Sequence, residues 1–68
     1  MTIGQAMRKA RKDKGYTLKK LEAKTGISRV SLSRYERGEC FPGILSLLSI
    51  ADVLQVTLDE LVGRTVAK

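Results

Sequence analysis

The stretch TLKKLEAKTGISRVSLSRYERG, which begins at Thr17, constrains the fold of this chain more than any other. Its pattern predicts two short helices, at about 18–25 and 29–36. Thr17 and Ser28 precede them, and such hydroxyls accept hydrogen bonds from the free N–H groups at the start of a helix. Gly26 lies between the helices, where the chain must take a positive φ that glycine adopts without steric cost. The two helices therefore meet at a tight turn.

The second of these helices carries an unusual load of arginine and serine on its exposed side. Leu32 and Tyr35 form its inward stripe, and we expect Tyr35 to pack in the core rather than to stack on a base. The residues left outward are Arg29, Val30, Ser31, Ser33, Arg34 and Arg37. An arginine fork matches the acceptors that guanine presents in the major groove of DNA. The stretch is thus a helix-turn-helix pattern, although solvated arginines are the ordinary alternative.

Length and composition restrict the remaining possibilities. A chain of 68 residues is expected to form one domain, near the lower size limit for folding without metals or disulfides, and its few aromatic residues indicate a mostly aliphatic core. Cys40 is the single cysteine and there is no histidine, so we expect no internal disulfide, no zinc or other metal site and no cofactor. No nucleophile has a base beside it, which disfavours an enzyme and a small-molecule substrate. Without a membrane-length apolar run or a signal peptide, we expect no membrane partner and a cytoplasmic location.

Charge is unevenly divided along the chain, whose net charge is +6. Residues 1–37 hold eleven Lys and Arg against three acids, whereas residues 38–68 hold two against four. A basic face attracts polyanions such as nucleic acids. A solvated lysine surface explains the bias equally well on its own, so the motif beneath it decides the interpretation.

Three further helices are predicted on either side of the central stretch. Capping boxes at Thr2–Gln5 and Thr57–Glu60 begin the first and the last of them. The fourth helix follows a loop punctuated by Gly and Pro, in which Phe41 is expected to cover the core. The five predicted helices lie at about 3–14, 18–25, 29–36, 44–54 and 58–62. The expected fold is an all-α, five-helix compact bundle, a single domain over residues 1–68 with a frayed tail at its end (63–68).

Several short motifs occur together in this chain. They are Arg11 with Gly15, Leu21, Gly26-Ile27-Ser28, Tyr35-Glu36-Arg37-Gly38, Pro42 and the run from Leu47 to Leu61. In this combination they resemble the lambdoid phage repressor and Cro-like helix-turn-helix family, over about residues 3–62. The resemblance implies the lambda-repressor-like DNA-binding fold. It also implies a sequence-specific transcriptional regulator, a dimeric repressor that binds double-stranded operator DNA with the helix at 29–36.

The resemblance further implies roles for single positions. Arg11 and Glu36 match a pair that forms a partly buried, structural ion pair and holds the helix at 29–36 in its docking angle. The positions that match base-contacting residues are Arg29, Val30, Ser33 and Arg34. The positions that match phosphate-contacting residues are Thr17, Lys19, Ser31 and Arg37. The chemistry agrees, because a valine methyl suits a thymine methyl and a helix amino terminus attracts phosphate, although Val30 could instead pack on the preceding helix.

The predicted helix at 44–54 has more apolar residues than one core face needs. Its expected inward face is Ile44, Leu47, Leu48, Ala51 and Leu54. One recognition helix covers too few base pairs to find a site in a genome, so we expect a two-fold homodimer on two half-sites. The surplus apolar residues of the acidic half are free to face a second copy. The expected interface residues are Leu45, Val53, Leu58, Val62 and Val66.

This sequence departs from the family pattern at three places. Leu18 stands where many phage repressors carry a glutamine that braces the first base contact. Glu22 replaces a customary small alanine, so either its helix is slightly rotated or Glu22 points outward. The residues Glu39-Cys40-Phe41 occupy a loop that is usually rich in basic residues.

Two other functions compete with the repressor hypothesis. The first is an antitoxin-like protein that binds a cognate protein partner and autoregulates its own operator, which the lack of a long toxin-wrapping extension disfavours. The second is a structural or non-specific nucleic-acid binder. Co-purification from lysate with and without salt distinguishes a protein partner from DNA.

Overall fold

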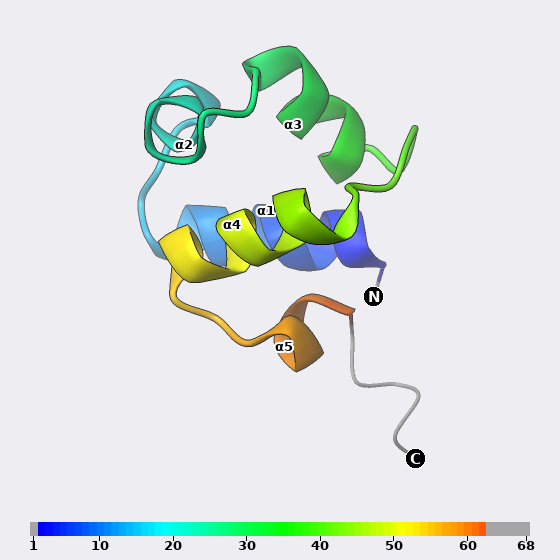
Figure 1. Ribbon diagram of the computed structural model, residues 1–68. Helices are drawn as coiled ribbons and strands as arrows, with labels where there is room; N and C mark the ends of the chain where they lie inside the picture. The colour runs from blue at the N-terminus through cyan, green and yellow to red at the C-terminus, as the bar shows by residue number, and fades with distance from the viewer. Residues whose placement is uncertain (1, 63–68) are drawn as a thin grey trace.

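The computed structural model describes residues 2–62, which contain five helices and no strand. The helices are α1 (Ile3–Asp13), α2 (Leu18–Thr25), α3 (Arg29–Glu36), α4 (Ile44–Leu54) and α5 (Leu58–Val62) (Figure 1). The all-α, five-helix fold expected from the sequence is confirmed. Only α1 ends earlier than expected, because Lys14 is its C-cap rather than its last residue. The tail expected at 63–68 lies outside the described residues.

Four helices begin at a Ser or Thr whose side-chain hydroxyl caps the helix, as the sequence predicted. The Thr2–Gln5 capping box is complete, with its two hydrogen bonds at 3.1 and 2.9 Å. The Thr57–Glu60 box is complete as well, at 3.1 and 2.8 Å. The hydroxyl oxygens of Thr17 and Ser28 each accept from the backbone N–H three residues on, at 3.0 and 3.1 Å. These caps satisfy N–H groups that have no partner inside their helix.

In two of the helices the C-cap residue itself has a positive φ. Gly26 is the C-cap of α2 with φ 78°, and its N–H donates to the Glu22 carbonyl oxygen at 2.8 Å. The tight turn predicted before α3 is therefore present. Gln55 is the C-cap of α4 with φ 58°, a conformation that non-glycine residues adopt uncommonly. No sequence signal marked that position.

The core is aliphatic, and all five helices contribute to it. Figure 1 shows α1 and α4 in the middle, with α2 and α3 on one side of them and α5 on the other. In agreement, α3 packs on α1 and α2, whereas α5 packs on α1 and α4. The largest fully buried side chains are Met7, Leu21, Leu32, Ile50, Leu54 and Leu61. One or more of them comes from each helix, so the burial of apolar area joins all five.

Two expectations about the fourth helix and its approach are wrong. Phe41 does not cover the core, because 79% of its surface is exposed in the loop between α3 and α4. Ile44 and Leu48 are also exposed. The inward face is instead Leu47, Ile50, Ala51 and Leu54. Eight of the eleven residues of α4 are apolar, so two overlapping stripes fit helical periodicity, and contacts with α1, α2 and α5 select between them.

Gly4 sets how closely α1 approaches α3. A Cβ atom built on Gly4 would lie 2.6 Å from the Glu36 carbonyl oxygen and would also clash with the Tyr35 carbonyl oxygen. Both oxygens belong to the backbone at the carboxyl end of α3, which cannot move aside as a flexible side chain does. The absence of a side chain at Gly4 therefore lets the two helices meet at this point.

Candidate nucleic-acid interface

The helix α3 is held by one edge and leaves the other open. Leu32 is fully buried and Tyr35 packs against the core, so Tyr35 is not free as a stacking platform. Arg29, Val30 and Arg34 are exposed on the outer side, and 69% of the Val30 surface is open. A helix with this division can enter a groove without losing its contacts with the rest of the protein.

Arg11 and Glu36 form a bidentate ion pair between α1 and the end of α3. The Arg11 Nε and Nη2 atoms donate to the two Glu36 carboxylate oxygens at 2.8 and 3.1 Å. Arg11 also donates through Nη1 to the Tyr16 carbonyl oxygen at 2.8 Å. The side chains of the pair are only 10% and 6% exposed. Three elements, α1, α3 and the turn before α2, thus share one buried hydrogen-bonded group.

At the amino end of α3, Arg29 meets the unusual acid of α2. Arg29 Nε lies 3.0 Å from a Glu22 carboxylate oxygen, and both side chains are partly open to solvent. Glu22 therefore points outward toward α3, while Leu18 packs against the core. The pair joins the amino end of α3 to α2.

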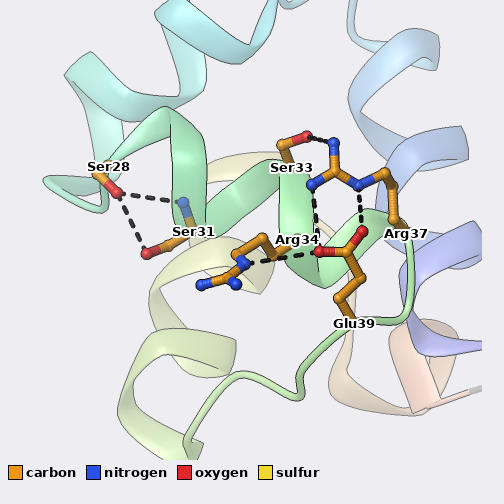
Figure 2. Close-up of polar contacts among 6 residues, drawn as sticks. All are labelled: Ser28, Ser31, Ser33, Arg34, Arg37 and Glu39. Atoms are coloured by element: carbon orange, nitrogen blue, oxygen red, sulfur yellow. Dashed lines mark hydrogen bonds and ion pairs between the residues drawn. The ribbon is translucent and has the colours of Figure 1, made fainter.

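At the carboxyl end of α3, two arginines share one carboxylate (Figure 2). Arg37 donates to the Glu39 oxygens from Nε at 2.9 Å and from Nη2 at 3.3 Å, and from Nη1 to the Ser33 hydroxyl at 3.0 Å. Arg34 Nε lies 3.5 Å from the same carboxylate. The hydrogen bonds and positive charge of Arg37, followed by those of Arg34, hold the pKa of Glu39 below its ordinary value.

The remaining candidate phosphate-contacting residues lie at helix amino ends. Ser31 is half-buried, and its hydroxyl lies 3.1 Å from the Ser28 hydroxyl. Thr17 and Lys19 are exposed at the start of α2, where the Thr17 oxygen accepts from the Lys20 N–H and its own proton is available to an acceptor. A helix amino end with such groups favours an anion.

The expected interface residues are not equally accessible. Leu45 is 77% exposed and Val62 is partly exposed. Val53 and Leu58 pack against the core, and Val66 lies outside the described residues. Phe41, Ile44 and Leu48 are further apolar residues that are exposed on α4 and the loop before it.

Several features of this surface had no counterpart in the sequence reasoning. Neither the contact of Glu39 with Arg34 and Arg37 nor the Glu22–Arg29 pair was anticipated. A signal for the first existed, since Gly38 marks a chain reversal that brings residue 39 back toward the preceding helical turn.

Within residues 2–62 no cluster of His, Cys, Asp and Glu is suited to a metal ion, and Cys40 is an exposed loop residue. No helix in the described part of the chain has the length and apolarity needed to cross a membrane.

Comparison with known proteins shows a matching family and a relative that is similar in sequence. The model of the HTH_3 family, described as helix-turn-helix, matches residues 7–61. The cryptic phage CTXphi transcriptional repressor RstR of Vibrio cholerae serotype O1 is 38% identical over 64 residues, which are 94% of this chain and 57% of that protein. This chain thus spans little more than half the length of that relative.

Two solved structures are similar in both fold and sequence. The crystal structure of SinR, the master regulator for biofilm formation, in complex with DNA has a TM-score of 0.83 and 38% identity, covering 88% of this chain and 97% of that one. The structure of the P22 c2 repressor with synthetic operator 9T in the presence of Tl⁺ has a TM-score of 0.87 and 30% identity, covering 93% and 96%.

Proposed function

Because the chain belongs to the helix-turn-helix family of the Cro and phage-repressor type, we propose that it is a sequence-specific transcriptional repressor that reads double-stranded DNA with α3. One observation carries the proposal: α3 is anchored by the buried Arg11–Glu36 pair while its arginine-bearing side stays open. The two similar structures determined with DNA support it.

In this proposal the outer face of α3 reads base edges. Arg29 and Arg34 present guanidinium forks suited to guanine O6 and N7, and the open methyl surface of Val30 suits a thymine methyl. Ser33 lies between them and can donate or accept through its hydroxyl. These four side chains occupy neighbouring turns of one helix, so they face successive base pairs along the groove.

A second group positions the helix by contacting phosphates. Thr17 and Lys19 at the start of α2, Ser31 in the first turn of α3 and Arg37 just after it flank the base-reading residues. Hydroxyls, free backbone N–H groups and positive charges at helix amino ends all bind phosphate oxygens. Such contacts fix register and carry no sequence information.

Two copies are proposed to bind two half-sites, with the α3 helices about 34 Å apart, one turn of DNA. Leu45, Val53, Leu58, Val62 and Val66 are the proposed interface residues. Val62→Glu is then expected to give a folded protein that sediments as a monomer and binds DNA far more weakly, while Leu45→Glu tests the α4 side of the same interface. Sedimentation of a wild-type monomer even on the operator, or of unaltered dimers in both variants, would refute this placement.

The proposal is tested by selecting bound duplexes from a random pool and measuring affinity for the selected sequence across salt concentrations. We expect a shared sequence to emerge and the log of the binding constant to fall by about 0.9 per neutralised phosphate for each tenfold rise in salt. No enriched sequence together with a flat salt dependence would contradict DNA binding. That result would favour the alternative in which a protein partner is the main ligand.

A further inference from the structure

Glu39 contacts two arginines, Arg34 in the last turn of α3 and Arg37 at its C-cap. Its carboxylate accepts two hydrogen bonds from Arg37, in the bidentate geometry that guanidinium groups also use for phosphate and for guanine, and forms an ion pair with Arg34. Arg34 is the proposed base-reading residue and Arg37 the proposed phosphate-contacting residue. One carboxylate, that of Glu39, therefore contacts both a proposed base-reading residue and a proposed phosphate-contacting residue (Figure 2).

The backbone fixes this arrangement. Gly38 has φ 77°, and its N–H donates to the Tyr35 carbonyl oxygen at 3.1 Å. The next N–H, that of Glu39, donates to the Arg34 carbonyl oxygen at 2.9 Å. These two bonds end α3 with a chain reversal that returns Glu39 to the last helical turn. The helix end thus brings the Glu39 backbone close to the last turn of α3, within reach of Arg34 and Arg37.

We propose that Glu39 is a specificity-determining residue, an internal acceptor that holds Arg34 and Arg37 until DNA offers better acceptors. The inference rests on the proposed function, since it concerns the same face of α3. On non-specific DNA, Arg34 has only phosphates to bind. Glu39 competes with these phosphates for Arg34, and its negative charge repels them. On the correct sequence, guanine supplies two aligned acceptors for Arg34. Glu39 therefore weakens binding to non-specific DNA more than binding to the correct sequence, and this difference raises the specificity of the protein.

The test compares Glu39→Gln with Asp52→Asn. Both variants remove one negative charge and keep the shape of the side chain, but Asp52 is exposed on α4 and lies outside the cluster of Ser33, Arg34, Arg37 and Glu39. Fluorescence anisotropy would give the affinity of each protein for the selected duplex and for a scrambled duplex of the same length and composition. A control for folding is the thermal melt of each variant.

We expect Glu39→Gln to tighten binding to the scrambled duplex by roughly three- to tenfold, the range for releasing one or two exposed ion pairs. Binding to the selected duplex should tighten less, so the specificity ratio falls, while Asp52→Asn leaves the ratio unchanged. In the free protein, the Nε–H signal of Arg37 in NMR spectra should exchange faster with water in Glu39→Gln alone.

Equal specificity ratios in the two variants, with wild-type binding intact and salt-sensitive, would overturn this inference and leave the proposed function standing. An Arg37 signal that is unchanged in Glu39→Gln would likewise overturn it. A wild-type protein that binds neither duplex would overturn both proposals, and the two failures are thereby distinguished.

Discussion

Two arginine–glutamate pairs at the carboxyl end of α3 have almost the same geometry. Arg11 and Glu36 meet through two hydrogen bonds at 2.8 and 3.1 Å, and Arg37 and Glu39 through two at 2.9 and 3.3 Å. The first pair is 10% and 6% exposed, whereas the second is 57% and 48% exposed. Water screens and competes for the second pair but not for the first. Burial thus makes one pair a fixed structural element and leaves the other open to exchange with a ligand.

The largest effect is expected from breaking the buried pair. Arg11→Ala or Glu36→Ala alone should lower the free energy of unfolding by about 3–5 kcal/mol, because the surviving charge stays buried without a partner. The double variant should lose less than the sum of the two single losses. Chemical denaturation of all three proteins measures this, and additive effects below about 1 kcal/mol would mean that the pair behaves like an exposed one.

A smaller loss is expected from separating α1 from the backbone that carries Glu36. Gly4→Ala introduces a Cβ into the carbonyl oxygens at the end of α3, and such overpacking destabilises a fold by about 1–3 kcal/mol. Gly43→Ala is a matched control, since Gly43 has φ −64° and no atom lies within 4 Å of its added Cβ. Equal melting temperatures for the two variants would show that α1 and α3 are not closely packed at Gly4.

The smallest effect concerns the exposed pair and its dependence on pH. Arg37 and Arg34 lower the pKa of Glu39 in the folded protein, so the carboxylate adds stability that is fully present above the ordinary carboxyl pKa. That contribution is lost as the pH falls through the lowered value. An NMR titration of the Glu39 carboxyl carbon should give a midpoint below the ordinary one, and Arg37→Gln should raise it. A midpoint that does not respond to Arg37→Gln would mean that the pair is not formed in solution.

Local signals predicted the helices of this protein well. Thr17, Ser28 and Gly26 act through bonds within a few residues of themselves, so their effects are visible in the sequence. Helix α4 could not be oriented in the same way. Leu48 and Ile50 are both apolar and both fit a helical stripe, and only contact with other helices buries Ile50 and exposes Leu48.

In the candidate site too, features set within one helix could be predicted, whereas contacts with residues outside that helix were harder to predict. The outward residues of α3 follow from its inward stripe, so Arg29, Val30 and Arg34 could be placed on the exposed side before the fold was known. The partner of Arg29 could not, because Glu22 lies on another helix. The contact of Glu39 with Arg34 and Arg37 follows from the sequence only when Gly38 is read as a chain reversal. Resemblance alone indicated the buried pair, since its members stand 25 positions apart in the chain.

The central claim is that α3 reads base edges, and Arg34→Ala compared with Arg37→Ala tests it most directly. Affinities would be measured for the selected duplex and for a set of duplexes that each carry one substituted base pair. We predict that Arg34→Ala loses about 1–3 kcal/mol of binding free energy and relaxes preference at one base pair, whereas Arg37→Ala weakens all duplexes alike. Uniform weakening of every duplex by Arg34→Ala, with the sequence preference of the wild type retained at each position, would contradict the account.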